Sequence, residues 1–233
     1  MNPILISLFP NPKPIIGVIH VGALPGAPAN TQTVDEIVAQ AVREAAIYRD
    51  CGVDGIIIEN MHDTPYLRGS VGPEIVAAMA VIGHAVKTES RLADEGLIQS
   101  SAAELLRYRK MIGAGRVQVW ADVKKKHSSH AITADISLGA TAEAVEFMRG
   151  DAVIVTGSVT GEAPKIADVE EANAHCRLPV LLGSGIDANN IADFYQAADG
   201  FIIGSHFKAD GHWANPVEAE RVRELMKLVE RIK

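Results

Sequence analysis

Two short stretches near the end of the chain decide the fold that the sequence predicts. They are Pro179-Val-Leu-Leu-Gly-Ser-Gly-Ile-Asp187 and Asp199-Gly-Phe-Ile-Ile-Gly-Ser205. Each is an apolar run that ends in a glycine-serine turn before an expected helix, and such a turn can point backbone N–H groups at an anion. Because (β/α)8 barrels often bind phosphate between the loops after their last two strands, we expect the two turns to form one phosphate site.

A short phrase recurs three times along the chain, in Gly52-Val-Asp-Gly-Ile-Ile-Ile58, Gly150-Asp-Ala-Val-Ile-Val155 and Ala198-Asp-Gly-Phe-Ile-Ile203. In each, a helix ends at a small residue, an aspartate follows and a continuous apolar run begins, as is typical of a parallel strand buried on both faces. We expect the aspartates to fix turns at the strand starts. Further strands are predicted at residues 14–19, 116–121 and 179–182.

Helical patterns lie between these strands. Apolar residues at helical spacing predict a helix over 34–46, Pro73 is suited to a first helical position, and Ser101 with Glu104 forms a capping box pattern. Shorter helices are predicted over 138–149, 165–175 and 187–197, and a last one from Pro216. Strands that alternate with single helices indicate an α/β fold with a parallel sheet.

Composition narrows the class of protein. With 233 residues, 48% of them hydrophobic, the chain can form a single domain over 1–233. The net charge of -7 argues against nucleic acid as a partner. The two cysteines lack metal-ligand spacing, and the segment Met1 to Pro14 resembles neither a secretory signal nor a membrane span. We therefore expect a cytoplasmic protein without a transmembrane segment.

Motifs from one family run through nearly the whole chain. They are Lys13-Pro-Ile-Ile-Gly-Val-Ile-His20 with Leu24-Pro-Gly-Ala-Pro28, Gly52-Val-Asp-Gly-Ile-Ile-Ile-Glu-Asn60, Gly72-Pro-Glu74, Ala103-Glu-Leu-Leu-Arg-Tyr-Arg109, Ala121-Asp122 with Lys126-His127, Val155-Thr-Gly-Ser158 with Thr160-Gly-Glu162, Gly183-Ser-Gly185, and Ile203-Gly-Ser205 with Lys208. The chain thus resembles the BtpA/SgcQ family, which is named for a photosystem I biogenesis factor and is classed among the ribulose-phosphate-binding barrels. The resemblance implies a TIM-type (β/α)8 barrel.

One part of the family pattern is missing. Members usually carry a third strand, its helix and a fourth strand before the segment Asp94-Glu-Gly-Leu-Ile98, and this block of about thirty residues is the size of one βαβ unit. Between Lys87 and Leu97 the chain has no room for it, and only six strands are recognisable. We therefore expect an incomplete barrel that leaves strand edges at Asp54–Glu59 and Arg116–Ala121.

Ionisable residues follow the predicted strands. Catalytic groups of parallel barrels gather at the carboxyl ends of strands, where His20, Glu59 and Asp122 are expected. A carboxylate directly after an apolar run is costly to bury unless it is paired, protonated or metal-bound. His20 and the two carboxylates are thus candidates for general acid–base catalysis or for binding Mg²⁺. Asp122 could instead form a salt bridge with one of Lys124 to Lys126.

Hydroxyl, amide and basic residues complete the predicted site. We expect Asn60, Lys126, His127 and Thr156 to contact substrate. The predicted phosphate contacts are the three glycine-serine turns and one lysine, namely Gly157, Ser158, Gly183, Ser184, Gly185, Gly204, Ser205 and Lys208. Asp187 is expected to cap the next helix.

The leading hypothesis is a barrel enzyme that acts on a small phosphorylated metabolite, a nucleotide or a sugar phosphate. The reaction type stays open between hydrolysis and an isomerase- or lyase-like proton abstraction. The alternative is a non-catalytic assembly factor that retains a phosphate pocket, as the family name implies. A homo-oligomer is plausible for either, and the chain has no P-loop or dinucleotide motif.

Overall fold

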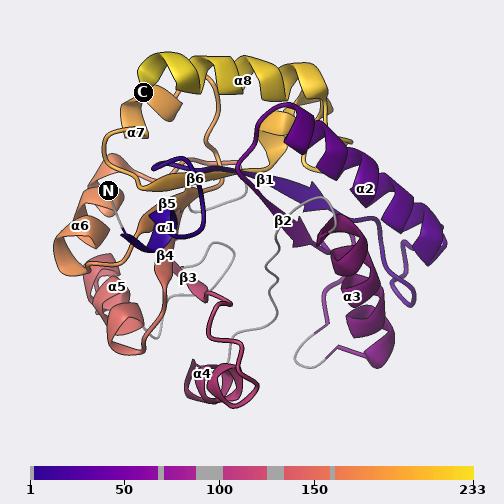
Figure 1. The fold of residues 1–233 in the computed structure, drawn as a ribbon, viewed down its shortest axis with the longest axis horizontal. Helices are drawn as coiled ribbons and strands as arrows, with labels where there is room; N and C mark the ends of the chain where they lie inside the picture. The colour runs from indigo at the N-terminus through magenta and orange to yellow at the C-terminus, as the bar shows by residue number, and fades with distance from the viewer. Residues whose placement is uncertain (1–2, 68–70, 88–101, 125–133, 158–160) are drawn as a thin grey trace. The chain divides into compact units, whose positions relative to one another are not determined.

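The computed structural model describes residues 3–67, 71–87, 102–124, 134–157 and 161–233 (Figure 1). The chain divides into two compact units, and each unit is formed by two separate stretches of the sequence. One unit contains Met1–Pro14 and Ile98–Ile202, and the other contains Ile15–Leu97 and Ile203–Lys233.

The unit that begins at Ile15 is built on two parallel strands, β1 (Ile15–His20) and β2 (Gly55–Glu59), whose register ends with His20 opposite Glu59. Its helices are α2 (Val34–Asp50), α3 (Pro73–Lys87), α8 (Ala219–Ile232) and the short η2 (Ser205–Phe207) and η3 (Ala209–Gly211). Figure 1 shows α2 beside β1.

Packing between α2 and β1 explains why this helix forms where it does. Thr33 and Glu36 make a reciprocal capping box at its start. Near its end, Tyr48 is fully buried, and its hydroxyl donates to the Val18 carbonyl at 3.0 Å. A side chain at position 17 would collide with the Tyr48 ring, so glycine allows the close approach of helix and strand.

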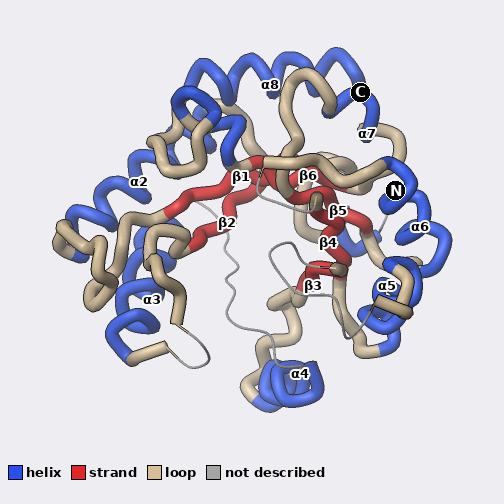
Figure 2. The backbone as a smooth tube through the Cα atoms, turned by 180° about the vertical axis from the view of Figure 1, so that it is seen from behind, coloured by secondary structure: helices blue, strands red, loops and turns tan. Residues whose placement is uncertain are grey.

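The other unit contains four parallel strands, paired in the order β3 (Trp120–Val123), β4 (Ala152–Thr156), β5 (Val180–Gly183) and β6 (Gly200–Ile203). Its helices are α1 (Pro3–Ile6), α4 (Ala102–Met111), α5 (Leu138–Phe147), α6 (Ile166–His175) and α7 (Ile191–Phe194). Figure 2 shows α5 and α6 along one side of these strands.

The repeated aspartates have the structural role that the sequence predicts. Asp54 accepts a hydrogen bond from the backbone N–H of Ile15 at 2.9 Å, and Asp199 accepts one from Val180 at 2.9 Å. Asp151 does the same for Val119 at 2.7 Å. Each aspartate therefore fixes the start of its own strand against the neighbouring strand, at the amino ends and not at the carboxyl ends.

Several predicted boundaries need correction. The strand expected over 116–121 begins at Trp120 and continues to Val123, because its hydrogen-bonded register starts with Trp120 opposite Ala152. The helix expected over 187–197 is only the short α7, and the last helix begins at Ala219 and not at Pro216. Pro73 does begin α3, as predicted. Ser101 of the expected capping box lies outside the described residues.

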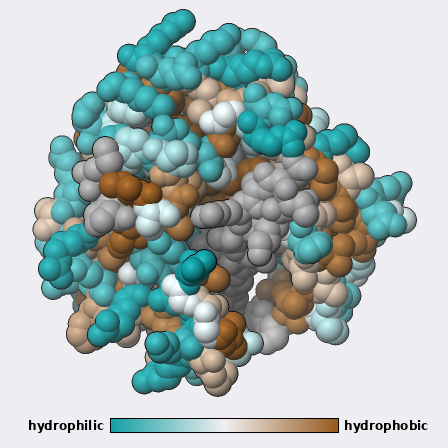
Figure 3. Space-filling view, viewed as in Figure 1, coloured by the Kyte–Doolittle hydropathy of each residue, from teal (hydrophilic) through white to brown (hydrophobic). Residues whose placement is uncertain are grey.

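Six parallel strands are present among the described residues, and β2 and β3 are the two ends of the strand order. These are the strands that we expected to be left as edges. Apolar side chains are exposed on the nearby helices: Val76 of α3 and Tyr108 of α4 are each more than half exposed, and α4 has no buried residue. Figure 3 shows brown apolar surface on the side where α2 and α3 lie.

No helix in the described ranges has both the length and the apolar character needed to cross a membrane. The cellular location expected from the sequence stays a prediction.

Candidate functional site

The carboxyl ends of β1 and β2 bring together two of the three predicted catalytic residues. His20 Nε2 lies 3.7 Å from Glu59 Oε2, a distance that their opposed positions in the strand register explain. The His20 side chain is 5% exposed and that of Glu59 is 42% exposed. A buried imidazole thus faces, beyond direct hydrogen-bond distance, a carboxylate that solvent or a substrate can reach.

A second contact fixes the orientation of the His20 ring. Its Nδ1 lies 2.7 Å from the backbone carbonyl oxygen of Trp213. Because a carbonyl oxygen only accepts, Nδ1 carries the proton, and in the neutral ring Nε2 is the basic nitrogen. The nitrogen that can take or give a proton is therefore the one that faces Glu59. Trp213 lies in an irregular segment before α8, where no sequence pattern predicted a contact with His20.

The loop after β2 is tied to the loop after β1. Asp63 accepts a hydrogen bond from the Leu24 N–H at 2.6 Å and one from the Asn60 side chain at 3.3 Å. His62 Nδ1 lies 2.8 Å from the Val21 carbonyl oxygen. Asn60, predicted to contact substrate, is therefore next to the His20–Glu59 pair but also helps to hold Asp63. Asp63 and His62 are positioning residues that the sequence analysis did not select.

The glycine-serine turn after β6 also reaches His20. A Cβ at Gly204 would lie 3.5 Å from His20 Nε2, so the backbone of Gly204 passes directly beside the imidazole. Ser205 begins η2 immediately afterwards. His20, Glu59, Asn60 and Gly204 are thus close together within one unit.

Lys208, which we expected to contact phosphate, is paired with Glu44 in this structure. Its side chain is buried, and its Nζ donates to Glu44 Oε2 at 2.9 Å, where both side chains are almost fully shielded from solvent. Burial lowers the pKa of the Lys208 ammonium, while the carboxylates of Glu44 and Glu59 act in the opposite direction. The ammonium already has a buried anionic partner, which favours a structural role.

In the other unit, β4 and β5 end side by side at Thr156 and Gly183. The hydroxyl oxygen of Thr156 is buried and has no hydrogen-bond partner within the described part of the chain. A buried polar atom without a partner is costly, so this hydroxyl is suited to bind a water or a ligand atom. Ser158, which we expected in the same loop, lies outside the described residues.

The turn after β5 has the backbone shape that the glycines suggest. Ser184 and Gly185 both have positive φ, +70° and +64°. A Cβ at Gly185 or at Gly157 would collide with the backbone of residues 162–163, so both glycines are required for the close packing of these loops. Asp187 then accepts hydrogen bonds from the N–H groups of Asn189 and Asn190. Because the residue that precedes α7 is Asn190, Asp187 holds the turn before the helix, and the prediction that it caps the helix is wrong.

Asp122 lies inside β3, opposite Ile154, and does not follow the strand as expected. Lys126 and His127 fall outside the described residues, so their predicted substrate contacts stay predictions. In the part of the chain that the structure describes, no group of three or more His, Cys, Asp or Glu side chains is placed to hold a metal ion. Mg²⁺ bound by Glu59 and Asp122 likewise stays a prediction.

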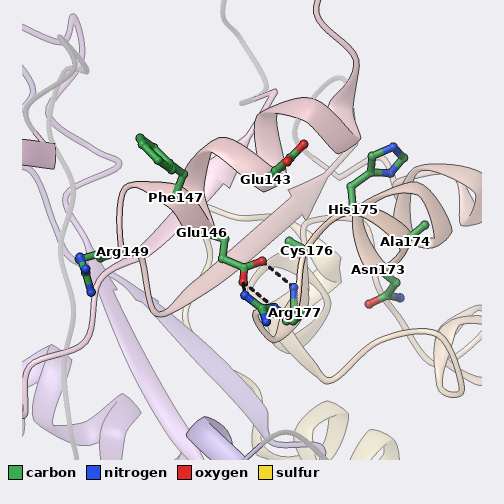
Figure 4. Close-up of a pocket in the computed structure, with 9 residues that line it drawn as sticks. All are labelled: Glu143, Glu146, Phe147, Arg149, Asn173, Ala174, His175, Cys176 and Arg177. Atoms are coloured by element: carbon green, nitrogen blue, oxygen red, sulfur yellow. Dashed lines mark hydrogen bonds and ion pairs between the residues drawn. The ribbon is translucent and has the colours of Figure 1, made fainter.

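A cavity of about 670 Å³ lies between the last turns of α5 and α6, at the amino ends of the strands (Figure 4). Glu146 accepts hydrogen bonds from the Arg177 side chain at 2.8 Å and from its backbone N–H at 2.9 Å, which lower the pKa of Glu146. Because these residues precede β5, the cavity is remote from the carboxyl ends of β4 and β5. We do not assign the candidate site to it.

Comparison with known sequences identifies the family. A sequence profile of the BtpA family matches residues 11–93 and 85–231. The chain belongs to the BtpA family. The two stretches that match the BtpA profile overlap at residues 85–93, within the region where we expect a strand-helix-strand block to be missing.

BtpA relatives match the chain over nearly its whole length. An uncharacterised mitochondrial protein of Caenorhabditis elegans is 36% identical over 272 positions, covering 99% of this chain and 98% of the relative. An uncharacterised protein of Pyrococcus horikoshii is 34% identical, covering 96% and 98%. The photosystem I biogenesis protein BtpA of Synechocystis is 31% identical, covering 94% and 88%. The nematode alignment is longer than this chain of 233 residues, so that BtpA relative has positions without a counterpart here.

Solved structures establish the fold class. (S)-3-O-geranylgeranylglyceryl phosphate synthase of Thermoplasma acidophilum matches with a TM-score of 0.60 and 15% identity, covering 99% of each chain. Orotidine 5'-phosphate decarboxylase of Pyrococcus horikoshii matches with a TM-score of 0.57 and 14% identity, covering 92% of this chain and 99% of that one. At such identities the likeness shows the fold alone. This BtpA member therefore has the TIM-type α/β fold that we expected, with six strands in the part of the chain that the structure describes.

Proposed function

We propose that the chain is an enzyme that acts on a small phosphorylated metabolite. The observation that carries the proposal is the His20–Glu59 pair, whose Nε2 and Oε2 atoms lie 3.7 Å apart at the carboxyl ends of adjacent strands. Catalytic groups of TIM-type barrels lie at this end. The hydrogen bond from Nδ1 to Trp213 sets the imidazole for proton transfer at Nε2.

The proposed phosphate contacts come from the glycine-serine turns. Positive φ at Ser184 and Gly185 can direct successive N–H groups to one side of the chain, and the Thr156 hydroxyl at the end of the neighbouring strand is buried. In the matched solved structures, the named substrate sn-glycerol-1-phosphate and the orotidine 5'-phosphate of the decarboxylase are phosphate esters. That the turns after β5 and β6 contact the same phosphate stays a prediction.

Thermal unfolding with a ligand panel tests the proposal. Sugar phosphates, nucleotides and inorganic phosphate should be compared, each with and without Mg²⁺. A ligand present at one hundred times its Kd stabilises a protein by about 2.7 kcal/mol, which is readily measured. Selective stabilisation by a phosphate ester is expected, whereas no response to any phosphorylated compound would refute the proposal.

Turnover assays then test the two side chains. His20→Gln and Glu59→Gln should each lower kcat by about 10²- to 10⁴-fold, because they remove a group that moves a proton. The reaction type can be separated by isotopes: hydrolysis incorporates ¹⁸O from labelled water, and proton abstraction exchanges substrate hydrogen for solvent deuterium. Variants that retain full turnover would show that the pair has no catalytic role.

The second candidate is a non-catalytic assembly factor, which the name of the Synechocystis relative favours. In that case, partners captured from a cell extract would persist when His20 and Glu59 are both replaced by alanine, and no substrate would be turned over. A homo-oligomer is compatible with either function and is also a prediction.

A further inference from the structure

A second cavity, of about 320 Å³, is bordered by Trp213 in the unit that contains the His20–Glu59 pair. Its polar lining residues are Gln32 from the segment before α2, Gln40 from within α2, His62 and Thr64 from the loop after β2, and Trp213. The remaining lining residues are glycine and alanine. This volume is at the lower end of the range for small-molecule sites. We call this cavity the Trp213 pocket.

The Trp213 pocket has an aromatic wall in a fixed position. The indole contacts the His62 ring with centroids 5.0 Å apart and the His20 ring at 6.1 Å. The backbone of Trp213 is also held by the hydrogen bond from His20 Nδ1. The residue that borders the cavity is thus the one whose backbone carbonyl orients the His20 imidazole.

Among the described residues, the lining has no charged carboxylate, ammonium or guanidinium side chain, which makes it a poor phosphate site. Its polar groups instead suit the edge of an uncharged ring. Gln40 donates through its Nε2 to Glu44, so its Oε1 is the acceptor, and His62 donates through Nδ1 to Val21, so its Nε2 is an acceptor in the neutral ring. Gln32 and Thr64 offer both donors and acceptors.

We propose that the Trp213 pocket binds the base of a nucleoside or nucleotide, with the base stacked on Trp213. Bases present flat faces for stacking and amino and keto groups for hydrogen bonding, and each base that stacks on an aromatic side chain gains appreciable affinity. The inference rests on the proposed function, because it specifies that the phosphorylated substrate is a nucleotide and not a sugar phosphate. The pocket itself can be tested without a phosphate.

Tryptophan fluorescence provides the test, because the chain has only two tryptophans. In a Trp120→Phe variant, emission reports on Trp213 alone. The full chain should be titrated with adenosine, guanosine, cytidine and uridine, and with ribose 5-phosphate, which lacks a base. At least one nucleoside should quench emission in a saturable manner, and ribose 5-phosphate should not.

A pair of variants at position 213 separates stacking from folding. Trp213→Leu should weaken nucleoside binding at least about fivefold by calorimetry, while Trp213→Phe should retain most of it, and both keep the backbone carbonyl that His20 requires. Absence of nucleoside binding would overturn the inference, and stabilisation by ribose 5-phosphate in the same samples would leave the proposed function standing. Nucleoside binding with no response to any phosphate ester would support the pocket and refute the proposed function.

Discussion

His20 and Trp213 are joined by a hydrogen bond of 2.7 Å between an imidazole nitrogen and a backbone carbonyl 193 residues further along the chain. The contact turns the basic nitrogen of His20 toward Glu59. It also gives an irregular segment of the chain, without helix or strand, a defined place next to the strand ends.

This contact predicts an uncommon imidazole tautomer. At high pH the neutral His20 should carry its proton on Nδ1, because the Trp213 carbonyl can only accept. Long-range ¹H–¹⁵N correlation spectra can assign the two nitrogens, and the spectrum of a His20→Asn variant identifies the signals that belong to this ring. A neutral ring protonated on Nε2 would contradict the geometry.

The buried pair of Lys208 and Glu44 should behave as a unit. Lys208→Met leaves the Glu44 carboxylate buried without its partner, and we expect the free energy of unfolding to fall by about 3–5 kcal/mol. The double variant Lys208→Met, Glu44→Leu should recover most of this loss, since no buried charge remains.

Denaturant unfolding of the two single variants and the double variant measures the coupling. The exposed pair of Glu220 and Arg223, with a 2.8 Å contact, is a suitable control and should show no measurable loss when one partner is removed. Additive losses for Lys208 and Glu44 would argue against a coupled pair, and would return Lys208 to the predicted phosphate ligands.

Gly185 should be far less replaceable than another glycine of the same backbone conformation. Gly185→Ala combines a positive φ, which costs an L-residue about 1–2 kcal/mol, with a collision against the backbone of residues 162–163. Gly52 has a φ of +78° but nothing within 4 Å of a built Cβ, so Gly52→Ala isolates the conformational cost. Urea unfolding should show the larger loss for Gly185→Ala. Equal losses would mean that the two loops can separate without cost.

Tyr48 should make the protein less stable in alkali. Burial, followed by the Glu44 carboxylate, raises the pKa of Tyr48 well above 10 in the folded state. Between the unfolded pKa near 10 and this higher value, only the unfolded chain has released the proton, so the stability contributed by Tyr48 is lost as pH rises.

A Tyr48→Phe variant isolates this effect. At pH 7 it should lose about 0.5–1.5 kcal/mol through the missing bond to Val18, and above pH 10 its stability should fall less than that of the parent. The lowered pKa of Lys208 has the opposite effect and increases stability as pH rises to 10.5. Because the parent and the Tyr48→Phe variant both contain Lys208, this effect cancels in the comparison. Parallel pH profiles would contradict the burial of the hydroxyl.

The order of strands and helices follows from local pattern. Apolar runs such as Ile56–Ile58 form buried strands, and the recurring aspartates accept hydrogen bonds from the neighbouring strand because a carboxylate at a strand start can reach an adjacent N–H. The sequence also predicts an incomplete barrel, since no apolar run typical of a strand lies between Glu59 and the segment around Arg116.

Some features of the candidate site could be predicted from local sequence pattern, and others depend on tertiary packing. The position of His20 and Glu59 at strand ends follows from the sequence, because parallel strands end on one face. The burial of Lys208 against Glu44 does not, since these residues are 164 positions apart and a lysine of similar local context is usually exposed. Asp122 was misplaced because strand ends depend on the register with the partner strand, which local pattern does not specify.

Side-chain periodicity and spacing along the chain were sufficient to predict the βα repeat and the ionisable residues at the ends of β1 and β2. The basic nitrogen of His20, the pairing of Lys208 with Glu44 and the place of Trp213 beside a cavity became evident from the three-dimensional structure. Those features depend on contacts between segments far apart in sequence, whose distances no local pattern encodes.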